Sequence, residues 1–184
     1  MGNGESSYRR FLAGDNEGMF EIVCEYQAGL MLYLNSYVQD IHTAEDLAED
    51  TFLELMLKRP KFSGNSSFKT WLFAIGRNIA KKHYRKHAKL SVVPLESQDY
   101  LAVEDEIEDN FIKAEQKRMV HHALHHLKLE YRQVLFLSYF EGFSIAEIAL
   151  IMKKSEKSVK NYLYKAKKAL KSELERNGFD YEES

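Results

Sequence analysis

Apolar residues recur at intervals of three or four along most of the chain, the spacing that places them on one face of an α-helix. This spacing predicts a long first helix over residues 15–40, in which Leu30 and Leu34 belong to the apolar face. We expect a second helix to begin at Thr43, which would cap it, and to end near Pro60, because proline cannot continue a helix.

Residues 62–67 interrupt the pattern with glycine, asparagine and serine, which favours a loop. Ser66 or Ser67 is then expected to cap a third helix that runs to about His87. The apolar positions of this helix are Phe68, Leu72, Ile75 and Ile79.

The second half of the chain shows the same spacing over 111–128 and 131–141. Ser144 opens a capping box and a short helix, a tight turn follows, and Ser155 or Ser158 begins a final helix. Because no segment alternates apolar and polar residues as a strand does, the pattern predicts an all-α protein.

The composition supports a folded core, since 45% of the 184 residues are hydrophobic and only two are prolines. Cys24, the single cysteine, excludes an intrachain disulfide and a cysteine zinc finger, and its apolar surroundings predict a buried, inert thiol. The N-terminus shows no apolar signal segment, and no run approaches the length of a membrane span. We therefore expect a cytoplasmic protein without membrane insertion.

The charge is unevenly distributed, although the net charge is only −2. Residues 91–113 contain seven acidic residues and one basic residue, which is typical of a linker. We therefore predict two small helical domains, over residues 1–90 and 114–184, joined by this acidic linker.

Each predicted domain contains one strongly basic segment. Residues 69–89 hold seven basic residues and no acidic one, and residues 153–171 hold eight lysines and one glutamate. Two such segments indicate a protein that binds a polyanion such as a nucleic acid. The alternative is two solvated helix faces.

The C-terminal segment has the order of a helix-turn-helix: a short capped helix, a tight turn and a lysine-rich helix. The outward face of the second helix would contact a major groove through Lys157, Ser158, Lys160, Asn161, Tyr164, Lys165 and Lys168. Asparagine suits adenine, and lysine suits guanine or a phosphate. A plain three-helix bundle with solvated lysines is the alternative.

Three stretches together resemble one known family. They are AEDLAEDTFLELMLKRPKF, SFKTWLFAIGRNIAKKHYRK and YRQVLFLSYFEGFSIAEIALIMKKSEKSVKNYLYKAKKAL. In this order, with an acidic linker between them, they resemble the extracytoplasmic-function (ECF) sigma factors of bacterial RNA polymerase. The resemblance implies a region-two-like helical domain followed by a region-four-like helix-turn-helix domain.

The resemblance also implies roles for residues of the first domain. Residues implied in docking on core RNA polymerase are Glu45, Asp46, Glu49, Asp50 and Phe52. Like charges one helical turn apart destabilise an isolated helix, so a basic partner would relieve them. Residues implied in recognising and melting the minus-ten element of promoter DNA are Asn65, Phe68, Lys69, Trp71, Arg77, Asn78, Lys81, Lys82, Arg85 and Lys86. Because Phe68 and Trp71 share the helical spacing of the apolar positions, at least one of them is expected to lie in the core instead. The helix-turn-helix residues named above would read the minus-thirty-five element.

The sequence departs from the usual family pattern at several positions. Lys82 stands where the family often has an acidic residue. Lys153 stands at the turn where glycine is usual, so a positive φ there would strain the backbone. Tyr162, Lys165 and Lys167 replace arginines, and because lysine lacks the planar fork of arginine, the promoter sequence is not carried over.

The remaining candidate chemistry is weak. Histidines one helical turn apart could chelate zinc or nickel, but no cysteine completes a ligand set for His121, His122, His125 and His126. We predict no metal site, no cofactor and no catalytic residue, and interpret this histidine cluster as a surface or interdomain feature sensitive to pH.

We therefore predict a non-enzymatic sigma factor whose partners are core RNA polymerase, promoter DNA and an anti-sigma factor, with no small-molecule substrate. One alternative is a stand-alone helix-turn-helix regulator that binds duplex DNA as a dimer. Another is an inhibitor that imitates a sigma-like surface.

Overall fold

The computed structural model describes residues 4–88 and 119–178, and every regular element within those ranges is a helix. The first bundle consists of α1 (Gly4–Leu12), α2 (Glu17–Val38), α3 (Ile41–Lys58) and α4 (Phe68–Ala88). The second consists of α6 (Leu129–Leu135), the π-helix η1 (Phe136–Phe140), α7 (Ile145–Met152) and α8 (Glu156–Arg176). The all-α, two-domain prediction is confirmed, whereas the predicted acidic linker lies outside the described residues.

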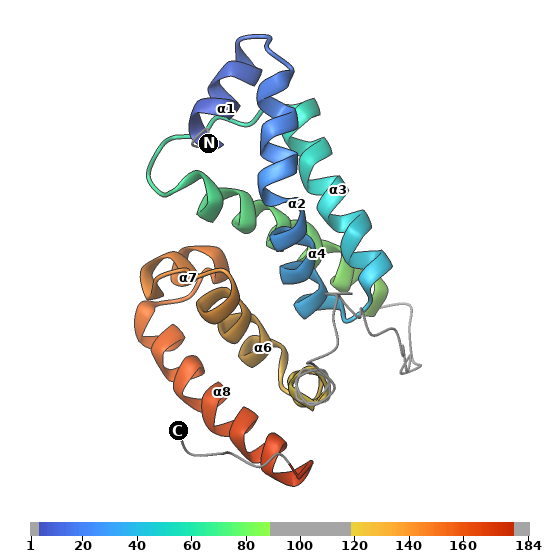
Figure 1. Ribbon diagram of the computed structural model, residues 1–184. Helices are drawn as coiled ribbons and strands as arrows, with labels where there is room; N and C mark the ends of the chain where they lie inside the picture. The colour runs from blue at the N-terminus through green and yellow to red at the C-terminus, as the bar shows by residue number, and fades with distance from the viewer. Residues whose placement is uncertain (1–3, 89–118, 179–184) are drawn as a thin grey trace, which may run out of the picture.

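The four helices of the first bundle pack against one another (Figure 1). The bundle forms because this packing buries their apolar faces. Leu30, Leu34, Leu55 and Leu72 are fully buried in its core. Helix α1, which the sequence analysis did not predict, adds Tyr8, and the Tyr8 hydroxyl donates a hydrogen bond to the Pro60 carbonyl at 2.8 Å.

The N-cap of α3 differs from the prediction. Asp40, and not Thr43, caps the helix, because the Asp40 carboxylate accepts a hydrogen bond from the Thr43 amide at 2.7 Å. Asp40 has an extended backbone, which places its side chain in front of the first turn. At α4, the Ser67 hydroxyl accepts a bond from the Thr70 amide, so Ser67 is the cap residue.

The second bundle contains the predicted helix-turn-helix. Ser144 and Glu147 form a complete capping box at the start of α7. Lys153 ends α7 in a left-handed conformation, and Ser155 caps α8. The helix expected over 131–141 begins at Leu129 and widens into the π-helix η1.

Cys24 is exposed, so the prediction of a buried thiol is wrong. Helix α2 buries the side defined by Ile22, Tyr26, Leu30 and Tyr33, and Cys24 is on another side of the helix. Apolar neighbours in sequence do not bury a residue when the helix turns it away from the core.

The two bundles are in contact, with α4 packed against α7 and α2 packed against α6 (Figure 1). Aromatic rings meet across this interdomain interface. The centroids of Phe73 and Phe143 are 5.1 Å apart, and those of Tyr33 and Phe136 are 6.3 Å apart. The apolar core is therefore continuous from one bundle to the other. Within the described ranges, no helix combines the length and apolar character that a bilayer crossing requires.

Candidate nucleic-acid interface

Helix α4 presents its basic residues mainly along its C-terminal half. Asn78, Lys82, Arg85 and Lys86 are exposed, and Lys81 is half-buried. Side chains at this spacing line a helix face that can follow the phosphates of a nucleic-acid strand. Asn65 is also exposed, in the loop before α4.

The N-terminal half of α4 contributes mostly to the core. Phe68 is only 3% exposed and packs among the rings of Tyr8, Tyr26, Phe62 and Trp71. Trp71 is half-buried against the same cluster. In this arrangement Phe68 has no free ring face for a nucleic-acid base.

Arg77 is also turned inward, with 8% of its surface exposed. Its positive charge lies close enough to Tyr33 and Tyr37 to offset part of the rise that burial causes in the pKa of each hydroxyl. The Arg77 Nε atom has no hydrogen-bond partner among the described residues. The structure thus buries Arg77 beside two tyrosines of α2.

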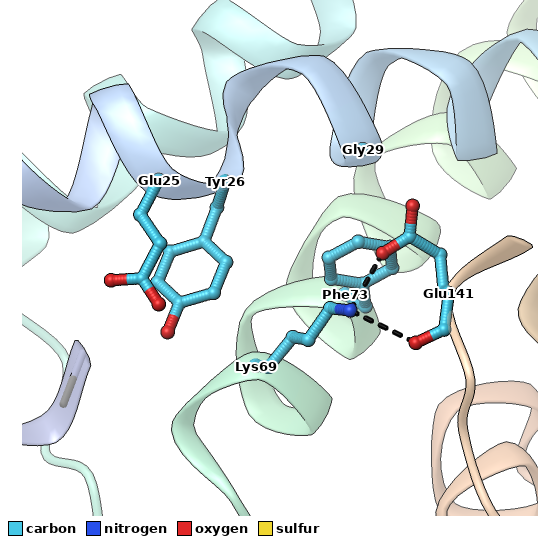
Figure 2. Close-up of a pocket in the computed structure, with 6 residues that line it drawn as sticks. All are labelled: Glu25, Tyr26, Gly29, Lys69, Phe73 and Glu141. Carbon is cyan, nitrogen blue, oxygen red and sulfur yellow. Dashed lines mark hydrogen bonds and ion pairs between the residues drawn. The ribbon is translucent and has the colours of Figure 1, made fainter. Parts of the chain in front are cut away.

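Lys69 lies at the interdomain interface. Its ammonium group is 2.7 Å from the Glu141 carboxylate and donates a hydrogen bond to the Glu141 carbonyl at 3.0 Å (Figure 2). The same group lies over the rings of Phe73 and Phe143. A residue predicted to bind DNA is therefore engaged by the second domain.

The electrostatic environment of Lys81 is strongly positive. The charges of Arg85 and Arg77 lower the pKa of the Lys81 ammonium from its ordinary value. Some burial adds to this effect, and Lys153 and Lys154, from the turn between α7 and α8, lower the pKa further. The turn between α7 and α8 therefore adds positive charge to that of α4 at this point, which concentrates positive potential.

Helix α8 holds its predicted DNA-binding residues at the surface. Six of the seven are exposed: Lys157, Lys160, Asn161, Tyr164, Lys165 and Lys168. The seventh, Ser158, is half-buried, and its amide donates a hydrogen bond to the Ser155 hydroxyl that caps the helix. The opposite side of α8 buries Val159 and Ala166.

Helix α3 carries an exposed stripe that the sequence analysis identified only in part. Four acidic residues are exposed as expected: Glu45, Asp46, Glu49 and Asp50. Phe52, the fifth expected docking residue, is 5% exposed and belongs to the core. Three large apolar side chains continue the stripe instead: Leu53, Met56 and Leu57. We call these seven exposed residues the docking face. The available signal in the sequence was the spacing of three or four residues between these positions, which the sequence analysis followed only for the acidic side chains.

Three residues of the interdomain interface were also missed: Gly29, Glu141 and Glu147. A glycine inside a helical pattern was the available signal for Gly29. Figure 2 shows Glu141 directed toward Gly29 and Lys69 across the small hollow between the two bundles.

The histidine cluster lies before α6. The Nε2 atoms of His122 and His126 are 3.3 Å apart, and burial together with Arg132 lowers the pKa of His125 from its ordinary value. Within 4–88 and 119–178, no three His, Cys, Asp or Glu side chains converge as a metal site would need.

Comparisons with known proteins identify both bundles. The family model for Sigma-70 region 2 matches residues 22–90, and the model for Sigma-70, region 4 matches residues 117–170. The ECF RNA polymerase sigma factor SigL of Mycobacterium tuberculosis is 30% identical over 156 residues, which cover 84% of this chain and 87% of SigL. The chain belongs to the ECF RNA polymerase sigma factors.

Other comparisons agree that the chain belongs to this family. RNA polymerase sigma-H factor of Pseudomonas aeruginosa is 26% identical over 175 residues, covering 90% of this chain and 91% of the relative. The sigma factor RpoE from Bartonella quintana, solved in complex with the anti-sigma factor NepR, has a TM-score of 0.68 at 24% identity. That match covers 84% of this chain and 95% of RpoE, and it supports the fold. The findings favour a sigma factor over a stand-alone helix-turn-helix regulator.

Proposed function

We propose that this sigma factor docks on core RNA polymerase through α3, recognises a two-part promoter through α4 and α8, and helps to melt the minus-ten element. The observation that carries the proposal is the order of the two family domains, each with an exposed basic helix surface. Two modest DNA-binding surfaces on one chain act together because binding of one raises the effective concentration of the other.

In the first domain, the proposed minus-ten surface is the exposed C-terminal half of α4. Its members are Asn78, Lys81, Lys82, Arg85 and Lys86, with Asn65 as a polar contact in the preceding loop. Single-stranded DNA binding requires cations along the backbone and a surface for unstacked bases. The exposed cations supply the first requirement. Lys69, Trp71, Phe68 and Arg77 can join this surface only if the first domain rearranges or separates from the second.

In the second domain, the proposed minus-thirty-five surface is the exposed side of α8. Asn161 is placed to read a base edge, and the surrounding lysines are placed to contact phosphates. The domain boundaries that we propose are 1–90 and 114–184, with residues 91–113 joining them.

The docking face of α3 is the proposed polymerase contact. Exposed acidic side chains in the first half of the helix complement a basic partner, and the apolar side chains of its second half would gain from burial. Leu57, for example, is 80% exposed. The proposal therefore extends the sequence-predicted docking set by Leu53, Met56 and Leu57 and removes Phe52.

The remaining parts of the proposal follow from this role. The sigma factor would have no catalytic activity of its own and would act in the cytoplasm, where the polymerase transcribes. An anti-sigma factor is the expected regulator, as the RpoE structure contains one for its own sigma factor.

Reconstituted initiation tests the proposal. The purified chain is mixed with core polymerase and a promoter library, and specific transcripts are sequenced. A triple variant, Lys82→Gln, Arg85→Gln and Lys86→Gln, should retain polymerase binding but form far fewer open complexes. Each lost contact to a single strand costs roughly fourfold in affinity near 0.15 M salt, or about fiftyfold for three.

The control removes the same charge from exposed basic residues outside the proposed surfaces, as Arg9→Gln, Lys61→Gln and Lys128→Gln. This control should initiate like the wild type. Absence of binding to core polymerase, or equal activity of both triple variants, would contradict the proposed function.

A further inference from the structure

The loop that joins α3 to α4, residues 60–67, contains Asn65, which is proposed above to contact the minus-ten element. Within the described ranges, residues 60–66 form no backbone–backbone hydrogen bond. Gly64 has a φ of 74°, and a Cβ atom built on it would meet nothing within 4 Å, so the tip of the loop is not packed against the bundle. The position of Asn65 is therefore determined by how the two ends of the loop are held.

The end of the loop that enters α4 is held by that helix itself. The Ser67 hydroxyl accepts a hydrogen bond from the Thr70 amide at 3.1 Å, and the Ser67 carbonyl accepts one from the Trp71 amide at 3.1 Å. These are the usual bonds of a helix N-terminus, which require no other element. The start of α4 is thus sufficient to fix this end of the loop.

The end of the loop that leaves α3 runs past α1, which holds it (Figure 1). The Tyr8 hydroxyl donates a hydrogen bond to the Pro60 carbonyl at 2.8 Å, between residues 52 positions apart in the sequence. The guanidinium of Arg59, the residue that ends α3, lies over the ring of Phe11 at 5.1 Å from its centroid. Two side chains of α1 therefore contact the chain where it leaves α3.

Tyr8 connects this end of the loop to the aromatic core of the first bundle. It is 1% exposed, and its ring centroid lies 5.5 Å from that of Phe68 and 5.4 Å from that of Trp71. Phe62, from the loop, contacts the same two rings. Burial raises the pKa of the Tyr8 hydroxyl to about 12, although the charge of Arg59 offsets part of the rise. The hydroxyl is thus protonated at neutral pH and can donate a hydrogen bond.

The hydroxyl distinguishes Tyr8 from a residue that only fills the core. A phenylalanine would keep the ring contacts with Phe68 and Trp71, whereas the bond to Pro60 requires the hydroxyl. Helix α1 also lies N-terminal to residues 22–90, which match the family model for Sigma-70 region 2. The contact between Tyr8 and the loop is therefore a feature of this chain beyond the matched domain.

We propose that Tyr8 is a positioning residue for promoter recognition, whose hydroxyl fixes the start of the loop so that Asn65 is held where it can contact a minus-ten base. This inference rests on the proposed function, because that function gives Asn65 its role. A polar side chain discriminates between bases only when it is held in the correct geometry. A loop with one loose end should therefore discriminate less.

Transcription from a promoter library tests this role with the holoenzyme. The library is randomised across both promoter elements, and transcripts are sequenced for the wild type, Asn65→Ala and Tyr8→Phe. Asn65→Ala should abolish the preference at one base position of the minus-ten element. Tyr8→Phe should reduce the preference at the same position about tenfold. Preferences in the minus-thirty-five element should remain unchanged, because α8 is not altered.

A double variant separates positioning from a general loss of stability. If Tyr8 acts through Asn65, Tyr8→Phe should have no further effect on base preference once residue 65 is alanine. Two independent effects would instead add. Additive behaviour would show that Tyr8 does not act through Asn65 and would overturn the inference.

Ser7→Ala is the matched control on the same helix. Ser7 is 1% exposed, and its hydroxyl donates a hydrogen bond of 2.6 Å to Glu21 of α2, so this substitution also removes one hydroxyl bond from α1. It leaves the bond to the loop in place and should keep the wild-type base preference. An equal loss of preference in Ser7→Ala and Tyr8→Phe would assign the effect to α1 as a whole and refute the role of the Tyr8 hydroxyl.

Fluorescence of the free chain measures the hold on the loop without polymerase or DNA. Trp71 is the single tryptophan of the sequence, and the ring of Phe62 lies 5.2 Å from it between centroids. Tyr8→Phe should increase the quenching of Trp71 by acrylamide, because a loosened loop covers the indole less, and Ser7→Ala should not. Equal quenching of the wild type and Tyr8→Phe would show that the hydroxyl does not hold the loop.

The two proposals fail separately. A chain in which Tyr8→Phe loosens the loop, but which never initiates transcription with core polymerase, keeps the contact between Tyr8 and the loop and loses the proposed function. A chain that initiates transcription, and whose base preference is unchanged by Tyr8→Phe, keeps the function and loses the positioning role.

Discussion

Lys153 holds the left-handed conformation that ends α7, with a φ of 52°. The same conformation ends α2 at Gln39 and α3 at Arg59, so three helices in the described part of the chain stop without the glycine that usually allows it. A residue with a Cβ atom is strained there by about 1–2 kcal/mol. The sequence analysis anticipated this strain at Lys153 from the missing glycine, and the positive φ confirms it.

Relief of this strain is measurable. Lys153→Gly should raise the free energy of unfolding by about 1 kcal/mol, because glycine adopts positive φ without steric conflict. Urea unfolding monitored by circular dichroism provides the value. Lys154→Gly is the matched control, since Lys154 has no positive φ and glycine there adds only chain entropy to the unfolded state. Equal effects of the two substitutions would refute the explanation.

Several single residues were assigned to the wrong environment from sequence. Cys24 is exposed although its neighbours are apolar, and Phe52 and Arg77 are buried although the family resemblance implied a surface role. Adjacent helix positions differ by about 100° around the axis. A small error in the orientation of a helix therefore exchanges buried and exposed positions at its edges.

Helix α4 combines two functions along its length. Its first half packs in the core and against α7, and its second half presents cations to solvent. The charge pattern predicted the basic helix correctly. Charge alone did not show that Lys69 would pair with a carboxylate of the second domain or that Arg77 would be buried. The proposed DNA surface of α4 is therefore shorter than the basic segment.

Helix α8 allows the two kinds of DNA contact to be separated. With holoenzyme on duplex promoter fragments, Asn161→Ala should relax preference at one base pair and cost about 1–3 kcal/mol there. Lys168→Ala should weaken binding to all sequences and reduce the salt slope by about one. Ser172→Ala, outside the proposed face, is the control. If Lys168→Ala changed base preference and Asn161→Ala did not, the assigned roles would be wrong.

Glu147 makes the stability of the whole molecule depend on pH, through its capping box with Ser144 and through its hydrogen bonds from Thr70 and Ser67 across the interdomain interface. The pKa of Glu147 in the folded protein lies below its ordinary value of 4.5. Its contribution to the free energy of unfolding is therefore complete above pH 4.5 and is lost as the pH falls through the lower pKa of the folded state. Glu147→Gln should therefore lower the free energy of unfolding at neutral pH. On acidification this free energy should fall less steeply than in the wild type. Urea unfolding between about pH 7 and pH 4 measures both slopes.

Glu45→Gln serves as the comparison, because Glu45 is exposed on α3, in the first domain and on its outer surface. Its unfolding curve should follow the wild type across the range. A wild-type acid slope that is unchanged in Glu147→Gln would show that the charged form of Glu147 does not stabilise the folded protein.

All helices named above except α1, most of their caps, the helix-turn-helix and the separation of charge are readable in the order of the amino acids, because each depends on residues within one or two helical turns. The burial of Arg77 and the pairing of Lys69 with Glu141 are not. They join positions far apart in the chain, such as Gly29 and Glu141, whose proximity exists only after the two bundles pack. Local periodicity carries no information about such a contact, so it took the folded molecule to reveal it.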